Sequence, residues 1–587
     1  MSTENLILSD KLIDKATGKE IHTDLHEIKG VLEQIAENQA SAADHAAYDS
    51  IFEAMLDGHN TTHVFTSWAH RAIAALTAEE NRYDLLVRWF TMLEEYAGNT
   101  TYTLRWYDDD ISDSPVMTPM DDLADGRTAA QLCTDSDTAV TDWADEDPMM
   151  WYIRANAISK ADGTMNVLAI EGVDTTFDIS GELGPVYAFQ MALWVNHHND
   201  GEYNYKSWKA QRAANYRPYA GDVDPNNEKR VLTWHPCFPG GISAGGGLTS
   251  GAGIKPANRM SAVTGIAKAR VTSAYEGLWC DCDTEWLLDM WQLRHWNLEN
   301  SGIAEGCTNY NYQYIVALGE NDVKRILLTP AQAANFLLRS SIMLGTHESG
   351  TNTDRSTAGN YDILDNVRVS SIEQVTVDDV TYGALYLDVD EEFSVPEGAF
   401  VSTAPWYSGE TEHLPAHKDG STYNLTNGRT PIRIAGIEVL DGTYTIGLDP
   451  LWNATVNADD NTKFDYEVFE CRDSVNLAGS ITANYVSTGI VHRAMATGWN
   501  WIKKFFDNPK GVLFPETFGG SSTGYYKSAF YGTPSAGVRA PWRFCSLAST
   551  TAAGLAGAAG CNTPSITYWN GRPRLSGSGK KRGEWAE

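Results

Sequence analysis

The 587-residue chain has few basic side chains for its length. It carries 44 Lys and Arg against 77 Asp and Glu, so its formal net charge is −33. Nucleic-acid phosphates repel so acidic a surface, and we therefore expect no nucleic-acid partner. Long apolar runs are also missing, because no stretch approaches the roughly 20 residues of a membrane-spanning helix. We expect no insertion into a membrane.

Cysteines are scarce as well. Eight cysteines in a chain of this length are too few for a disulfide scaffold, and Cys280-Asp281-Cys282 has the wrong spacing for a zinc knuckle. Residues 1–14 lack a basic n-region, an apolar h-region and a small-residue cleavage site, which predicts no secretory signal. We therefore expect free thiols in a protein made in a cytoplasm, with no metal and no cofactor.

Glycine and aromatic residues are plentiful. The chain contains 50 Gly, 19 Trp and 27 Tyr, a composition that favours strands and irregular loops fixed by aromatic packing. We predict an α+β chain in four parts. These are a small helical module with an acidic linker (1–130), a β-rich domain (131–235), a larger domain in two pieces (236–325 and 415–587), and a β insertion within it (326–414).

Two patterns define the N-terminal part. Apolar residues recur at helical spacing from about Leu25 to Tyr96, as in the run Leu85, Leu86, Trp89, Phe90 and Leu93. The stretch from Asp108 to Asp147 is acidic and rich in turn residues, but it lacks the spacing of an EF-hand loop. A solvated linker is the favoured interpretation, with calcium binding left open.

The central part alternates between strand and helix signals. Residues 152–170 predict a hairpin around Asp162-Gly163, and the glycine-dense run 239–253 predicts a turn-rich surface loop. Thr284 to Asn300 predicts one amphipathic helix with Asp283 or Thr284 as its N-cap. Thr329-Pro330 predicts the start of a short helix that continues to about Met343.

No catalytic motif withstands inspection. Gly520 to Gly524 fits G-x-S-x-G, but the next segment is strand-like and no histidine follows His492, so a Ser-Asp-His order cannot be completed. His197-His198-Asn199-Asp200 is the densest polar cluster, yet it lacks the partners of a known metal or catalytic motif, and a polar loop is the better interpretation. We predict a binding protein and name no catalytic residue.

The most informative segment lies near the C-terminus. From Phe544 to Gly571 there is no charged residue and no histidine, although 21% of the chain is charged. Proline, asparagine and four glycines exclude a membrane span here. Apart from Trp569, every residue from Cys545 to Asn570 belongs to the set obtained when the adenines of AAC or AAT codons are randomised. That restriction is typical of adenine-directed diversity-generating retroelements.

The residues around this tract carry a resemblance to a known family. They include Trp499-Asn500-Trp501, Gly519-Gly520-Ser521, Val538-Arg539, Trp542-Arg543-Phe544, Ala553-Gly554-Leu555-Ala556 and, upstream, the segment 427–438 followed by Asp441-Gly442. With these features the chain resembles the variable proteins of diversity-generating retroelements in tailed phages and prophages, a group that includes the major tropism determinant. The family's tryptophan-rich strand has Tyr444 as its aromatic partner here, which is a departure.

The resemblance implies a C-type-lectin fold for the two-piece domain, with a variable region near 543–571. It implies that variable side chains project outward from a rigid scaffold. The scaffold would comprise Trp499, Trp501, Arg539, Trp542, Arg543 and Trp569. The ligand-binding residues would be Cys545, Ser549, Thr550, Thr551, Ala552, Ala559, Cys561, Asn562, Ile566, Thr567, Tyr568 and Asn570.

The function implied is host attachment. We expect a virion protein of the tail tip or tail fibre that binds a bacterial surface receptor, either protein or glycan. Residues 1–130 would serve virion attachment or oligomerisation, with other tail proteins as partners and a homotrimer as the expected assembly. Two alternatives stay open, a virion-associated glycan hydrolase and a structural baseplate or capsid-surface protein.

Overall fold

A computed structural model describes residues 69–70, 73–74, 81–130, 143–298, 313–346, 355, 357–413, 431–544, 546–549, 552–577 and 581–585. Strand makes up 39% of the structure and helix 15%, so the chain is α+β and mostly β, as predicted. No helix in these ranges is long and apolar enough to cross a membrane. The helical pattern expected between Leu25 and residue 68 lies outside the described residues.

Four α-helices are described: α4 (Arg82–Ala97), α5 (Ala262–Thr272), α6 (Asp281–His295) and α8 (Pro330–Ala333). The apolar spacing predicted for α4 is confirmed. Leu85, Leu86, Trp89, Phe90 and Leu93 are all buried, and the Asn81 side chain caps the first turn by accepting a hydrogen bond from the Tyr83 N–H. Short 3₁₀ turns are η3 (Trp143–Glu146), η4 (Ala220–Asp222), η6 (Ala358–Asn360), η7 (Glu410–His413) and η8 (Ser474–Asn476).

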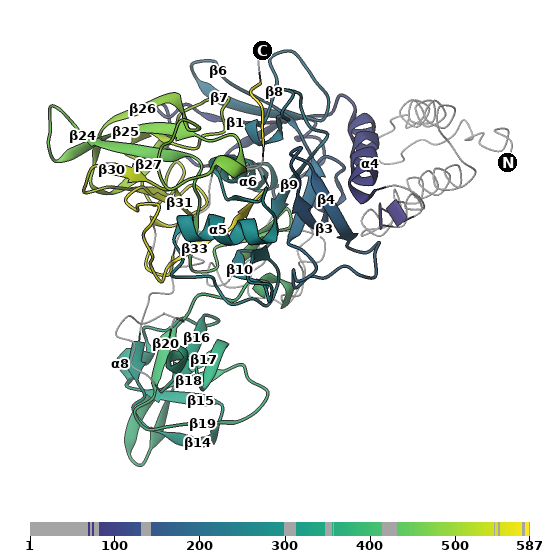
Figure 1. Ribbon diagram of the computed structural model, residues 1–587. Helices are drawn as coiled ribbons and strands as arrows, with labels where there is room; N and C mark the ends of the chain where they lie inside the picture. The colour runs from purple at the N-terminus through teal and green to yellow at the C-terminus, as the bar shows by residue number, and fades with distance from the viewer. Residues whose placement is uncertain are drawn as a thin grey trace, which may run out of the picture.

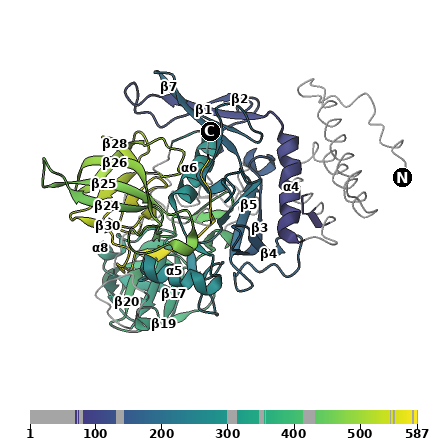
Figure 2. The same cartoon turned by 45° about the horizontal axis from the view of Figure 1, so that its top comes forward.

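Helix α6 runs through the middle of the main body (Figures 1 and 2). It begins three residues before the predicted start and ends at His295, and its N-cap is Cys280. The cap differs because the Asp283 carboxylate accepts a hydrogen bond from the Cys280 N–H and so extends the helix backwards. The helix is buried on nearly every side. Its amphipathic face was therefore predicted wrongly.

Two antiparallel sheets form the N-terminal half. In spatial order the first contains β2 (Thr118–Asp121), β1 (Thr101–Tyr107), β7 (Tyr203–Lys209), β6 (Trp194–Asn199) and β8 (Arg217–Pro218). The second contains β4 (Met165–Ile170), β3 (Tyr152–Ser159), β5 (Val186–Met191) and β9 (Leu232–Pro236). The predicted hairpin is confirmed as β3 and β4, which pair from Ala155–Ile170 to Ser159–Met165.

Several local predictions in this half need correction. The acidic stretch is not a solvated linker throughout, because β2 pairs with β1 and the Asp147 carboxylate is buried against the Tyr102 hydroxyl. The glycine-dense run forms the hairpin of β10 (Gly240–Ile242) and β11 (Leu248–Ser250), whose residues are largely buried. Glycine is required at Gly240, where a Cβ would lie 1.9 Å from the Pro573 carbonyl oxygen.

The C-terminal half contains a seven-stranded and a four-stranded sheet. The seven-stranded sheet has the order β28 (Pro515–Phe518), β27 (Gly498–Phe505), β29 (Ala529–Gly532), β32 (Ala558–Ala559), β31 (Trp542–Phe544), β23 (Tyr444–Ile446) and β33 (Gly571–Pro573). The four-stranded sheet has the order β26 (Val486–Ala496), β25 (Lys463–Glu470), β24 (Leu451–Val456) and β30 (Gly537–Arg539). Two small ribbons pair β12 (Gly277–Leu278) with β34 (Leu575–Ser576), and β21 (Ile432–Ile434) with β22 (Ile437–Val439).

The inserted segment forms a separate lobe (Figure 1). Its main sheet has the order β13 (Gln313–Ile315), β20 (Phe400–Thr403), β16 (Ser341–Gly345), β17 (Leu364–Val377), β18 (Val380–Leu387) and β15 (Arg325–Leu328), beside the ribbon of β14 (Glu320–Val323) and β19 (Phe393–Val395). The lobe therefore begins at Gln313, before residue 326. Thr329 caps α8 as predicted, but the helix ends at Ala333, turns follow, and β16 begins at Ser341 within the predicted range.

One hydrophobic core runs through the main body from Ala69 to Leu575, while the lobe has its own core, centred on Ile326, Leu344 and Val401. Three acidic residues of α6 connect the sheets of the main body. Asp281 binds Arg543 on β31, Asp283 lies 2.8 Å from His235 on β9, and Asp289 binds Lys206 on β7. Through these contacts helix α6 connects the N-terminal and C-terminal halves of the main body.

Candidate functional site

One face of the seven-stranded sheet carries a row of aromatic side chains. Trp499 lies opposite Tyr531 across β27 and β29, Tyr531 lies opposite Ala559, and Ala559 lies opposite Trp542. Directly paired residues in neighbouring strands point to the same face of a sheet. These residues therefore share one side of the sheet.

The opposite side of the same sheet faces the core. Phe530, one residue before Tyr531, is completely buried and contacts Trp452 and Phe514 at centroid distances of 5.4 Å each. Because side chains alternate along a strand, burial of Phe530 directs Tyr531 outward.

The outward row continues into the charge-free tract. Trp499 packs edge-on against Tyr531 at 5.1 Å, Trp542 against Tyr568 at 6.1 Å, and Tyr444 lies 5.7 Å from Trp542. Trp499 is 42% exposed and Tyr568 47% exposed. We call Trp499, Tyr531, Trp542, Tyr444 and Tyr568 the outer aromatic cluster.

Both ends of the charge-free tract are held by the same short strand. β23 pairs antiparallel with β31, where the tract begins, and parallel with β33, where it ends. In between, β32 pairs with both β29 and β31. The tract is therefore attached to the sheet at three places and is free to form loops between them.

Buried arginines fix these attachments. Arg543 donates two hydrogen bonds to Asp281 Oδ1, at 2.8 and 2.6 Å, and each side chain is 1% exposed. Burial raises the pKa of Asp281 to about 6, although the Arg543 guanidinium opposes that shift. At the other end, Arg572 is ion-paired with Asp441, and Arg574 donates to the carbonyl oxygens of Glu438 and Pro236 at 2.7 Å each.

The interior of the tract is held by neutral hydrogen bonds. The Tyr444 hydroxyl and Ser549 Oγ lie 3.0 Å apart, and Ser549 Oγ also accepts a hydrogen bond from the Ser546 N–H at 3.1 Å. Burial raises the pKa of Tyr444 to about 12, so the hydroxyl keeps its proton and remains a donor at neutral pH.

The predicted ligand-binding residues divide into distinct groups. Cys545, Thr550 and Thr551 lie outside the described residues. Thr567 and Tyr568 are exposed, and Cys561, Ile566 and Asn570 are half-buried. Ser549, Ala552, Ala559 and Asn562 are buried, with at most 9% of their surface exposed. For these four the predicted outward projection is wrong, because the tract folds back over the sheet and covers its own middle.

The predicted scaffold residues also differ from one another. Arg539, Trp542 and Arg543 are buried, and Trp501 and Trp569 are half-buried. Arg539 fixes the turn before β30, since its guanidinium donates to the Ser535 carbonyl oxygen at 2.6 Å. Trp499 is too exposed for an interior scaffold role and belongs to the outer surface instead.

Sequence reasoning missed the buried arginines of the C-terminal segment. Arg572 and Arg574 are 1% exposed, and Arg582 is ion-paired with Asp449 and Glu470 at 3.0 and 3.3 Å. A signal was available, because Arg572 and Arg574 are two residues apart in an extended segment, where alternate side chains point to one side. Their acidic partners lie more than a hundred residues away in sequence, and the pattern alone does not pair them.

The acidic residues 108–110 and the cysteines are the other groups that could bind a metal or react as nucleophiles. The carboxylates of Asp108, Asp109 and Asp110 lie within 4.8 Å of one another, but the Lys503 ammonium is 3.2 Å from Asp109 and 3.5 Å from Asp110 and supplies positive charge there. Cys237, Cys280, Cys282, Cys471 and Cys561 are free thiols, as predicted, and Cys133, Cys307 and Cys545 lie outside the described residues.

His197 and His198 lie on strand β6 and not in the predicted polar loop. Their side chains point to opposite faces, as expected for neighbours in a strand. His197 lies 3.3 Å from Asp507, and His198 stacks on Tyr205 at 4.5 Å. Neither belongs to the outer aromatic cluster.

The outer aromatic cluster can supply contact area and hydrogen bonds, and the tract beside it contributes no ionisable acid or base from Phe544 to Gly571 other than thiols and Tyr568. Such a surface is suited to binding and poorly suited to acid–base catalysis. No protein-family model matches the chain, and no curated protein matches it at a significant level.

Proposed function

We propose that the protein is a receptor-binding protein of a phage or prophage virion, located at the tail tip or tail fibre. In this proposal the two-piece C-terminal domain has a C-type-lectin-like fold, and its outer aromatic cluster binds a ligand on the bacterial surface. The observation that carries the proposal is the charge-free tract, which is attached to a sheet at both ends and places the exposed Tyr568 in one aromatic cluster with the exposed Trp499.

The attachment explains how a binding surface can change without loss of the fold. The ion pairs of Arg543 and Arg572 lie at the two boundaries of the tract and stabilise the core whatever the exposed side chains are. Exposed positions such as Thr567 and Tyr568 then contribute contact area and hydrogen bonds, as aromatic and small polar residues do in antibody paratopes.

Burial narrows the set of positions that could vary. Ala559 lies between β29 and β31, beneath the aromatic row, and Ser549 is bonded to Tyr444. Replacing either residue by a larger one would require repacking of the cluster. Among the described positions, diversification would therefore act chiefly on Cys561, Ile566, Thr567, Tyr568 and Asn570.

Several copies of the protein on one virion would strengthen binding to the cell. The exposed aromatic anchors are few, so a single site would bind weakly. Several copies on one virion, as a homotrimer attached through residues 1–130, would raise the effective affinity by about 10²–10⁴-fold.

The direct test measures adsorption of the purified protein to cells of the bacterial host. We expect Trp499→Ala and Tyr568→Ala each to reduce cell binding at least about tenfold, a loss of about 1.4 kcal/mol, without lowering the melting temperature. Tyr275→Ala is the matched control, because Tyr275 is 39% exposed but lies outside the cluster. Unchanged adsorption in both variants would reject the proposal in favour of a structural virion role.

A second test addresses diversification. Sequencing of the gene and its surroundings in many individuals of the source population should find a near-repeat of the 545–570 coding tract beside a reverse transcriptase. Substitutions at adenine positions, concentrated in codons of the exposed residues, are the expected result. An invariant tract without a repeat would contradict this part of the proposal.

A further inference from the structure

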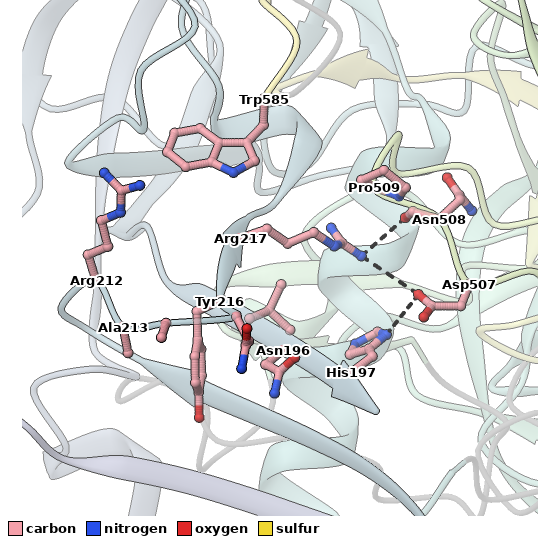
Figure 3. A pocket seen from close by; sticks show the side chains of 13 residues that line it. Asn196, His197, Arg212, Ala213, Tyr216, Arg217, Asp507, Asn508, Pro509 and Trp585 are labelled. Carbon is pink, nitrogen blue, oxygen red and sulfur yellow. Dashed lines mark hydrogen bonds and ion pairs between the residues drawn. The ribbon is translucent and has the colours of Figure 1, made fainter. Parts of the chain in front are cut away.

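A second concave site lies at the edge of the β6–β8 sheet, away from the outer aromatic cluster. Its cavity has a volume of about 660 Å³ and is formed by the sheet edge, the segment 507–509 and Trp585 (Figure 3). Pockets for small ligands usually have volumes of about 300–1,000 Å³. The cavity is therefore large enough for one or two sugar rings.

One arginine in the wall has no counter-ion in the described part of the chain. The Arg212 guanidinium lies 5.4 Å from the ring centroid of Trp585 and 5.7 Å from that of Trp194. Among the described residues no carboxylate lies within ion-pair distance of it, in a chain whose net charge is −33. Figure 3 shows Arg212 and Trp585 on one side of the cavity and Asp507 and His197 on the other.

The other charges of the wall leave it positive. Arg217 lies 3.9 Å from both Asp507 and Glu285, and its Nη1 is buried without a hydrogen-bond partner among the described residues. Burial lowers the pKa of His197 to about 4, and a hydrogen bond from His197 lowers the pKa of Asp507 to about 2. At neutral pH the lining residues therefore hold two arginines, one carboxylate and a neutral imidazole, a net charge of about +1, and the neighbouring Glu285 is only partly ionised because burial raises its pKa to about 7.

The remaining surface is polar or aromatic. Trp585 is half-buried and held in place, because Arg582 is ion-paired in the core and Glu584 is ion-paired with Arg472 at 2.7 Å. The side-chain amides of Asn196 and Asn215 also line the cavity and make no hydrogen bond to another described residue. An indole can stack on the C–H face of a sugar ring, and free amides can bind its hydroxyl groups.

From these features we propose that this cavity binds an acidic saccharide, with the sugar carboxylate on Arg212 and the ring against Trp585. A planar guanidinium matches a carboxylate through two parallel hydrogen bonds. A phosphate is disfavoured, because the cavity wall contains no lysine and no helix N-terminus. None of the lining residues belongs to the outer aromatic cluster, so this inference stands independently of the proposed function.

The test is titration of the full chain with D-glucuronate, followed by calorimetry or by ligand-observed NMR. D-glucose and acetate are the comparison ligands, because glucose has the sugar ring without the carboxylate and acetate has the carboxylate without the ring. We expect glucuronate to bind with a Kd of about 1 mM or tighter, and both comparison ligands to bind at least about tenfold more weakly. Arg212→Gln and Trp585→Ala should each weaken glucuronate binding at least about tenfold.

Two control variants separate binding from folding. Arg493→Gln and Tyr275→Ala alter exposed residues that lie outside the cavity, and they should leave the affinity for glucuronate unchanged. Arg212 is exposed and makes no ion pair among the described residues, so its substitution should not change the melting temperature. Absence of glucuronate binding, equal binding of acetate, or an unchanged affinity in Arg212→Gln would each overturn the proposal.

Discussion

Arg543 and Asp281 form an ion pair from which water is almost completely excluded, since each side chain is 1% exposed. Such a pair contributes little net stability compared with a well-packed apolar pair, but removal of one partner leaves a buried charge without compensation. Arg543→Met should therefore lower the free energy of unfolding by about 3–5 kcal/mol. Urea denaturation followed by tryptophan fluorescence measures this loss.

The control for that experiment is the exposed pair of Arg493 and Asp465, in which Arg493 is 72% exposed. Arg493→Gln should change the free energy of unfolding by less than about 1 kcal/mol. A similar small change in Arg543→Met would mean that the attachment of the tract does not depend on this ion pair.

Glu285 gives the protein a pH dependence that is opposite to that of most carboxylates. Burial and the nearby Asp289 raise the pKa of Glu285 from 4.5 to about 7, while Arg217 opposes the shift. Between these two pKa values the folded state binds more protons than the unfolded chain does. The stability contributed by Glu285 is therefore complete below pH 4.5 and is lost as the pH rises through 7.

Substitution of Glu285 tests whether this residue makes the folded state less stable as the pH rises. Glu285→Gln should be more stable than the parent protein at pH 8, by an amount on the order of 2 kcal/mol, and should differ little from it at pH 5. Thermal or urea denaturation at both pH values measures the difference. Glu202→Gln alters an exposed carboxylate, and its stability should equal that of the parent protein at both pH values. If Glu285→Gln gained the same stability at pH 5 as at pH 8, titration of Glu285 would not be the cause.

Strand β33 reaches the sheet only because its first residue has no side chain. A Cβ on Gly571 would lie 2.5 Å from Trp542 Cη2 and 2.8 Å from Ile446 Cδ1. Gly571→Ala should therefore destabilise the protein by about 1–3 kcal/mol and displace Trp542 within the outer aromatic cluster. Cell adsorption should weaken in the same variant.

Gly245→Ala is the appropriate comparison. Gly245 is exposed, has a negative φ, and a Cβ there would approach only Ser243 Oγ, at 3.7 Å. Its melting temperature and adsorption should match those of the parent protein. If Gly571→Ala behaves in the same way, β33 is not closely packed against Trp542.

Local signals predicted some elements well and others poorly. The periodicity of α4 was sufficient, because that helix has one buried side and one less buried side. The hairpin of β3 and β4 was predicted from the Asp162-Gly163 turn between two strand-like runs, although β3 is buried on both faces. Helix α6 has no such contrast, since charged and apolar residues alike are buried. Its acidic residues are compensated by Arg543, His235 and Lys206, which come from three distant strands, and no local pattern contains that information.

The candidate site could also be predicted only in part from the sequence. The absence of charge from Phe544 to Gly571 identified the tract from the sequence alone. The sequence did not reveal which of its residues are covered, because Ala and Ser are compatible with exposed and buried positions alike. Trp499 was misplaced for the related reason that a tryptophan can stabilise a core or serve as an exposed contact.

At the scale of the whole molecule, the lobe is attached through two adjacent strands. Gln313 on β13 pairs with Ser402 on β20, so the chain enters and leaves the lobe at neighbouring positions. Its core is also separate from that of the main body. A chain in which a short Gly-Ser link replaces residues 313–403 should therefore still fold.

Thermal denaturation tests that expectation. The main body of the shortened chain should melt within about 4 °C of the parent, because the lobe has a separate hydrophobic core and meets the body through polar contacts, such as Lys255 to Asp365 at 3.4 Å and Arg355 to the Pro405 carbonyl oxygen at 2.6 Å. Loss of the cooperative transition would show that the lobe is part of the folding unit.

The C-terminal segment has a consequence for how the protein is made. Gly571 to Trp585 supplies β33, β34 and three buried arginines to a body whose other parts are translated much earlier. Until these residues leave the ribosome, Asp441 and Asp449 have no arginine to balance their charge, and the central sheet lacks its last strand. The body therefore closes only after translation has passed this segment. Chains truncated before Gly571 should therefore fail to complete their core and should be digested by proteases more readily than the full chain.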